Sequence, residues 1–273
     1  DFSQIESDVA QIGVNERFAL FYPEKRPFFL EGVDLFATPF SAVYTRSVTS
    51  PSGGLRVTGR SRYTSFTALG VHDRGGGTVI IPGPQGSAFV PQDYQSDVGI
   101  FRLRRDVGQS FVSVIGTGRL TDGGGYHAVI GPDFQWRPSN MDAVTAQALW
   151  SSTQTPDRTD LTSEWNGQTL EDRALLLRAS RNTPTVDLFV QGQDLGPDFR
   201  ADEGFIPQVG YREGYFEAGY TIRPKDAFLS RLRLFTIDWY DAEYDGDLLS
   251  QRVSVGAGMD GLLNSFIRVE LNQ

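Results

Sequence analysis

The chain has no cysteine, only two histidines and no long apolar run in its 273 residues. Without cysteine it can form neither disulfides nor thiolate metal sites. No stretch of about 18 apolar residues is present, which excludes a transmembrane helix. His72 and His127 lie far apart in the sequence, and each is interpreted as a polar-face residue rather than a zinc ligand. Neither a nucleophile elbow nor a phosphate-binding loop occurs.

A surplus of basic charge is also lacking. The chain has 25 Lys and Arg against 34 Asp and Glu, a formal net charge of -9. Because such a chain repels phosphate, we expect no nucleic-acid partner. In contrast, glycine is abundant at 30 residues and aromatics make up 12%. This composition favours many strands joined by turns.

From about residue 40 onward, apolar and polar residues alternate in stretches of about ten. Because strand side chains alternate between faces, each stretch has one apolar and one charged face. Such strands fit a soluble sheet with one wet face, or a membrane barrel with lipid outside and a polar lumen. The stretches include residues 55–60, 128–137, 186–193, 216–223, 253–260 and 267–271.

Strand length and turn pattern favour the barrel. About ten residues at ~3.3 Å each, tilted by roughly 40°, span about 25 Å, the height of an outer-membrane apolar band. Tight turns are predicted at residues 105–109 and 181–184. Long polar loops are predicted at 74–96, 154–170, 194–206 and 241–250. The sequence therefore predicts an all-β, antiparallel, up-and-down transmembrane β-barrel portion of about twelve strands over residues 40–273, incomplete at its C-terminus.

Residues 1–39 differ from the rest and are predicted to form an irregular N-terminal segment with one short helix. Pro27 is suited to start the helix and Gly32 to end it. Charged residues lie here among aromatics, which indicates either a plug or gate, or a fixed corner held by Lys25 or Arg26 paired with Glu24 or Glu31. We favour the fixed corner. The motif comprises Glu24, Lys25, Arg26, Phe28, Phe29, Glu31 and Gly32.

Two acidic loops and one glycine motif are candidate binding sites. The first loop resembles half of a calcium loop, but Arg252 stands where the bidentate Glu would be needed. A solvated acidic loop is therefore the favoured interpretation. The glycine motif at 256–261 is followed by a strand pattern and not a helix, which argues against a dinucleotide site. The acidic loops are Asp241, Glu243, Asp245 and Asp247, and Asp194, Asp198, Asp202 and Glu203.

Two larger sets of residues are expected to mark the interior and the membrane boundary. A lumen would be lined by arginines and carboxylates, and amphipathic rings would lie at headgroup level. The expected lumen residues are Arg56, Arg60, Arg102, Arg104, Arg178, Arg231, Asp97, Asp133, Asp187 and Glu217. The expected girdle residues are Tyr63, Phe66, Trp136, Trp150, Tyr211, Tyr215, Trp239 and Tyr240.

Several motifs resemble a family of uncharacterised bacterial outer-membrane β-barrel domains, whose members usually lie C-terminal to a family 9-like carbohydrate-binding module. The resemblance covers most of the chain. It implies a bacterial outer-membrane location and a sugar-binding module upstream, which these residues do not include, and it carries over no catalytic residue. The motifs are Asp1–Asp8, Phe21–Gly32, Tyr44–Arg46, Gly54–Arg60 and Phe101–Gly108.

The preferred hypothesis is an outer-membrane barrel that acts in channel formation, transport or surface anchoring. Its partners would be membrane lipid and lipopolysaccharide, with polysaccharide reached only through an upstream module. We expect no cofactor, with calcium at the first acidic loop as the one alternative. The alternatives are a carbohydrate-active hydrolase with its site in the long loops, and a soluble β-rich binding domain.

Overall fold

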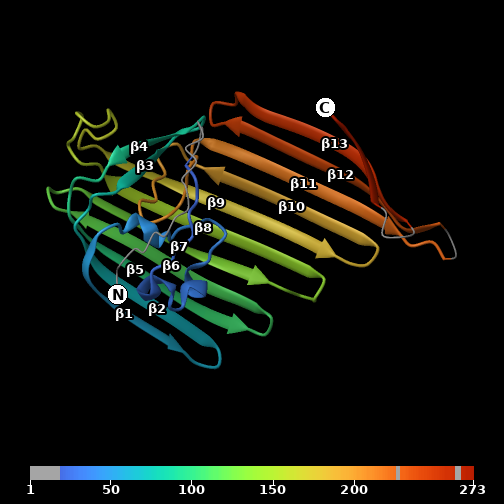
Figure 1. Cartoon of the computed structure of the whole chain (residues 1–273), viewed down its shortest axis with the longest axis horizontal. Helices are drawn as coiled ribbons and strands as arrows, with labels where there is room; N and C mark the ends of the chain where they lie inside the picture. Colours follow the sequence, from blue (N-terminus) through green and yellow to red (C-terminus); the bar gives the residue numbers. More distant parts are fainter. Residues whose placement is uncertain (1–18, 226–227, 262–265) are drawn as a thin grey trace.

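Twelve antiparallel strands form one large curved sheet in the computed structural model, which describes residues 19–225, 228–261 and 266–273 (Figure 1). The strands are β1 (Pro51–Arg60), β2 (Thr64–Asp73), β5 (Ser96–Val107), β6 (Ser110–Thr121), β7 (Tyr126–Trp136), β8 (Asp142–Gln154), β9 (Thr169–Asn182), β10 (Val186–Leu195), β11 (Tyr211–Ile222), β12 (Leu229–Glu243), β13 (Leu248–Gly261) and β14 (Phe266–Asn272). Their order in the sheet is β1-β2-β5-β6-β7-β8-β9-β10-β11-β12-β13-β14. The prediction of an all-β antiparallel protein with about twelve strands is confirmed.

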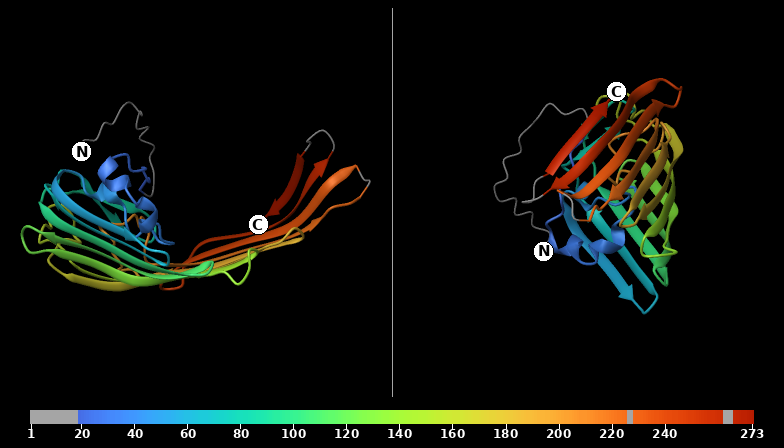
Figure 2. Two further views of the ribbon diagram at one scale, coloured as in Figure 1. Left: turned by 90° about the horizontal axis from the view of Figure 1, so that it is seen from below. Right: turned by 90° about the vertical axis from the view of Figure 1, so that its right-hand side faces the viewer.

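The sheet is open. Strands β1 and β14 lie at opposite ends of the order and do not pair with each other. The curvature is pronounced, but the two edges remain apart (Figure 2). A closed barrel is therefore not what the described part of the chain forms, and barrel closure stays a prediction.

Connections at the two ends of the strands differ in length. The predicted tight turns are confirmed at residues 108–109 and 183–185, and they lie at the same end of the sheet (Figure 1). We call this the short-turn end. Residues 74–95, 155–168 and 196–210 connect strands at the opposite end, the long-loop end.

Two of the predicted loops are wrong in detail. Residues 74–96 contain a separate hairpin, β3 (Thr78–Pro82) and β4 (Ser87–Pro91). Residues 241–250 belong mostly to strands β12 and β13, because the charges of Asp241 and Glu243 alternate with Ala242 in a strand pattern. Only residues 244–247 form the turn, with Gly246 at a φ of 100°.

The N-terminal part of the described chain packs against the concave face of the sheet (Figure 2). We call residues 24–48 the covering segment. It contains α1 (Pro27–Leu30) and the 3-10 turns η1 (Val33–Phe36) and η2 (Thr45–Ser47). Helix α1 begins at Pro27, and Gly32 adopts the left-handed conformation at φ 59° just after it. Residues 1–18, including the first resemblance motif, lie outside the described residues.

Two apolar clusters join the covering segment to the sheet. In the first, Phe29, Phe36 and Val48 pack on Leu69 and Ile100, and further sheet residues complete it. The second joins Phe40 and Ala42, and Phe199 of the 196–210 loop, to sheet residues Ile115, Val129, Leu149, Ala174, Leu176 and Leu195. Burial of each large apolar side chain contributes about 1.5–3 kcal/mol, so these contacts stabilise the docked segment.

The convex face of the sheet is apolar and exposed. Leu55 is 72% exposed, Ile130 54% and Leu177 57%. On the same strands as Ile130 and Leu177, Asp133 and Leu176 point to the concave side and are buried. The predicted alternation is thus present, with most apolar side chains on the open convex face and most charged side chains toward the covered side.

Candidate functional site: the concave face and its covering segment

Arg26 anchors the covering segment. Its side chain is 2% exposed and forms an ion pair with Glu24 at 2.7 Å. The guanidinium also donates hydrogen bonds to the carbonyls of Val48 and Thr45, each at 2.7 Å, and lies 4.2 Å from the centroid of the Phe29 ring. A guanidinium whose donors are bound in this way is a fixed structural element, as the fixed-corner interpretation expects.

Glu24 completes this corner. Burial favours the neutral carboxyl, but hydrogen bonds from Arg26 and from the Thr45 hydroxyl outweigh burial and lower the pKa of Glu24 to about 2. The carboxylate therefore remains charged across the physiological range. Lys25 is exposed and Glu31 is exposed, so of the four charged residues in the motif it is Arg26 and Glu24 that form the buried pair.

The other end of the motif docks on strand β1. Arg56 donates to the carbonyls of Phe28 and Phe29 at 3.3 and 3.4 Å, and its guanidinium lies 5.0 Å from the centroid of the Phe36 ring. Asp34 adds an exposed ion pair with Arg60 at 2.6 Å. Arg56 and Arg60 thus face the concave side as expected, where they hold the covering segment.

A second buried charge cluster ties the 196–210 loop to the sheet. Arg119 on β6 and Glu203 are 2% and 0% exposed and meet at 2.5 Å. Arg119 also donates to Ser96 Oγ and to the Ser47 carbonyl. This pair was missed from the sequence, because nothing local connects residues 84 positions apart.

His127 lies beside this cluster. Its Nε2 accepts a hydrogen bond from the Asp202 backbone N–H at 3.1 Å, and Nδ1 contacts Thr153 Oγ1 at 2.8 Å. Glu203 Oε2 is 3.6 Å from Nε2 and has no hydrogen-bond partner among the described residues. His127 is therefore a buried tether of the loop. His72 pairs with Asp97 at 2.8 Å on the convex face, where the two are 43% and 72% exposed. The predictions of a polar-face His72 and a lumen-lining Asp97 are therefore wrong, because both alternate with neighbours that are buried on the concave side.

Another expected lumen pair is present in the covered region. Arg102 and Asp133 meet at 2.9 Å and are 2% and 1% exposed. Beside Asp133, Gln147 Oε1 accepts a hydrogen bond from the Phe40 backbone N–H at 2.7 Å. The covering segment thus packs over buried polar groups of β5, β7 and β8 on the concave face.

The concave face beyond β9 carries a polar network of its own. Arg233 bridges Asp187 and Glu217 across three strands. Gly219 lies between them, and a Cβ there would be 2.5 Å from Arg233 Nε and from the Asp187 carboxylate. Farther along, Arg178 donates to Gln191 at 2.7 Å, and Gln191 donates to Glu213 at 2.9 Å. Arg231, by contrast, pairs with Asp260 at the short-turn end.

The expected aromatic girdle is only partly formed. Trp136, Trp150 and Tyr240 are exposed on the convex face. Tyr215 is on the concave face instead, where its ring contacts Phe189 and Trp239. Closeness to a strand end does not by itself tell which face of the sheet a side chain is on. That depends on its place in the alternation along the strand.

The two acidic loops do not form metal sites. Asp241 and Glu243 lie on β12, where Ser250 donates to Asp241 and Gln85 to Glu243. Asp245 accepts from the Asp247 backbone. Among residues 19–225, 228–261 and 266–273, no group of three His, Cys, Asp or Glu is arranged to hold a metal. In the second loop, Asp194 binds Arg212 and Tyr244, while Glu203 binds Arg119.

The glycine motif at 256–261 forms part of strand β13. A Cβ on Gly256 would lie 2.5 Å from the Phe235 ring, so the glycine accommodates an aromatic side chain from the neighbouring strand. Such an aromatic–glycine contact is a sheet-packing device. The motif therefore has no nucleotide-binding geometry.

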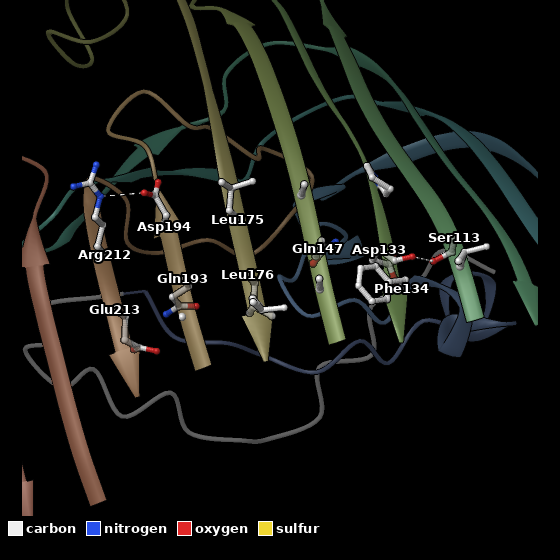
Figure 3. A pocket seen from close by; sticks show the side chains of 16 residues that line it. Ser113, Asp133, Phe134, Gln147, Leu175, Leu176, Gln193, Asp194, Arg212 and Glu213 are labelled. Atoms are coloured by element: carbon white, nitrogen blue, oxygen red, sulfur yellow. Dashed lines mark hydrogen bonds and ion pairs between the residues drawn. The ribbon is translucent and has the colours of Figure 1, made fainter. Parts of the chain in front are cut away.

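The described structure has several hollows, and two of them involve residues discussed above. One of about 310 Å³ lies between the covering segment, the β3–β4 hairpin and the 196–210 loop, and includes Tyr44, Arg119 and Phe205 in its lining. The other, of about 650 Å³, is shown in Figure 3. Its walls include Phe134, Leu175 and Leu177, and small residues at Ala146 and Gly192 leave it open. Because Phe134 and Leu177 face outward, this second hollow is an apolar depression of the convex face.

Comparison with known proteins gives no further assignment. Neither a protein family, nor a curated protein, nor a solved structure matches the chain. The resemblance to outer-membrane β-barrel domains stays a prediction. No helix among the described residues is long and apolar enough to cross a membrane.

Proposed function

We propose that this chain forms part of the wall of a bacterial outer-membrane β-barrel, with its convex face in lipid and its concave face toward a polar interior. The observation that carries the proposal is the exposure of apolar side chains along almost every strand of the convex face. Residues such as Leu103 (48%), Ile130 (54%) and Val255 (51%) would be unfavourable in water over so wide an area.

Strand dimensions support the same proposal. Strands β5 to β9 are 11 to 14 residues long. At ~3.3 Å per residue and a tilt of roughly 40°, they span about 25–35 Å, enough for the apolar part of an outer membrane. Typical strands of soluble sheets have about 5–6 residues.

The covering segment bears on the role of such a barrel. It is fixed by the Glu24–Arg26 corner and fills the concave side of the first strands. A barrel lined in this way is narrow on this side, which favours an anchoring role or a plugged pore over a wide open channel.

Membrane fractionation combined with a heat-modifiability gel tests the proposal. We expect the protein in the outer-membrane fraction, released only by detergent and running faster on the gel before boiling than after. Extraction as a soluble monomer without detergent would refute it. Conductance across planar bilayers then separates the roles, because a plugged wall gives small or no steady currents and an open channel gives large ones.

A further inference from the structure

The short-turn end of the sheet is basic and aromatic, whereas the long-loop end is acidic. At the short-turn end, exposed cations lie without an acidic partner among the described residues: Arg62, Arg105, Arg137, Arg223 and Lys225. Exposed carboxylates gather at the other end, as at Asp122, Asp157, Asp160, Asp198, Asp245 and Asp247. The net charge of -9 is therefore distributed unevenly, with exposed cations at the short-turn end and exposed carboxylates at the long-loop end.

Two of these cations share one aromatic ring. The guanidinium carbons of Arg62 and Arg105 lie 5.0 and 5.5 Å from the centroid of the Tyr63 ring, which is 44% exposed. Arg105 also donates to Thr64 Oγ1 at 2.8 Å. The nearby Asp106 does not neutralise them, because its carboxylate accepts from Arg104 at 2.8 Å. Two like charges are thus held around one ring, and an anion between them would relieve their repulsion.

The neighbouring hairpins extend this arrangement. Arg137 follows the exposed Trp136, and its backbone N–H donates to Ser110 Oγ at the start of the neighbouring strand β6. Arg223 donates to the Pro184 carbonyl of the adjacent turn. The exposed cations therefore lie at the ends of several strands, and Arg62, Arg105 and Arg137 lie next to aromatic rings that suit the lipid–water boundary.

We call Arg62, Arg105, Arg137, Arg223 and Lys225 the basic rim. We infer that the basic rim binds the phosphate headgroups of anionic phospholipid. The inference rests on the proposed membrane function. In outer-membrane barrels the short turns lie on the periplasmic side, where the leaflet is phospholipid. Exposed arginines at that depth attract anionic headgroups, with about a fivefold gain in binding for each cation near the surface.

Fluorescence quenching by brominated lipid in vesicles tests this inference. Trp136 lies next to Arg137 and reports on lipid near the rim. Substitution of Trp150 and Trp239 by Phe removes the other exposed indoles, while the buried Trp165 gives a constant background. The full chain would be folded into vesicles of phosphatidylcholine and phosphatidylglycerol, with one or the other lipid brominated.

We expect brominated phosphatidylglycerol to quench more than brominated phosphatidylcholine at equal mole fraction. In R62Q/R105Q, which removes two cations, the preference for phosphatidylglycerol should fall by up to about 25-fold or be lost. It should also weaken between about 0.05 M and about 0.5 M NaCl. The matched control R74Q/R173Q removes the same charge from exposed arginines of the long-loop end and should keep the preference.

Equal quenching by the two lipids in the parent protein, or a preference that persists in R62Q/R105Q, would overturn the inference while leaving the membrane proposal intact. Absence of quenching by either lipid would instead show that the protein does not enter the bilayer, which would overturn both.

Discussion

Replacement of Glu203 by Gln tests how the 196–210 loop is held on the concave face. Glu203 is 0% exposed, and its Oε1 receives the Arg119 Nε–H at 2.5 Å. The amide of Gln keeps the shape and one acceptor but removes the charge, which leaves the Arg119 guanidinium buried without a counterion. Removal of one partner from a buried pair destabilises by about 3–5 kcal/mol, and the remaining acceptor places E203Q near the lower limit, about 3 kcal/mol.

The assay is urea unfolding of the full chain folded in detergent micelles, followed by tryptophan fluorescence, together with limited proteolysis of the loop. The control D198N changes an exposed carboxylate of the same loop and should alter the free energy of unfolding by less than about 0.5 kcal/mol. A double substitution, R119M/E203M, replaces both charges with apolar groups and should recover much of the lost stability.

Equal stability and equal protease resistance of E203Q and D198N would refute this reasoning. That outcome would mean that Glu203 and Arg119 are solvated, and that the loop is not docked through them.

Three further changes test other parts of the account. Because the pKa of Glu24 lies at about 2, below its ordinary 4.5, its stabilising effect is fully present above about pH 4.5 and is lost as the pH falls toward 2. In urea titrations at pH 7, E24Q should therefore be less stable than the parent by about 2 kcal/mol, after allowance for solvent screening. This loss of stability should shrink as the pH falls from 4.5 toward 2, and an unchanged loss at pH 2.5 would contradict the prediction. G219A places a Cβ 2.5 Å from Arg233 Nε and should destabilise by about 1–3 kcal/mol in the same titrations, whereas no change would mean that the ion pair is not formed there. I130R puts a charge on the convex face near the middle of β7 and should destabilise the protein in vesicles by about 2–4 kcal/mol. L120R puts the same charge near the end of β6 and should destabilise it by only about 0–1 kcal/mol. Equal effects of the two substitutions would argue against a lipid-facing surface.

Much of the sheet could be predicted from the sequence, because alternation and turn residues are local signals. The period of two at residues 128–137 predicted that Ile130 and Asp133 face opposite sides, and they do. The turn at Gly108 was expected from its sequence alone. Closure of the sheet has no such local signal, and the structure shows an open sheet in its place.

Long-range contacts account for most of what the sequence did not predict. Arg119 and Glu203 are 84 residues apart, and the Phe40 N–H reaches Gln147 across 107 positions. Neither partner carries a motif that points to the other. Trp239 was assigned to a girdle by its place near a strand end, but register puts its ring on Tyr215 inside the curve.

Alternating accessibility along β10 tests the central claim most directly. The chain has no cysteine, so single cysteines can be introduced cleanly at L188C and V190C on the convex face and at Q191C and Q193C on the concave face. In protein folded into vesicles, a water-soluble maleimide should label the two concave positions and leave the two convex positions unlabelled until the membrane is dissolved. Equal labelling of all four positions, or labelling of the convex pair alone, would contradict a lipid-facing convex surface.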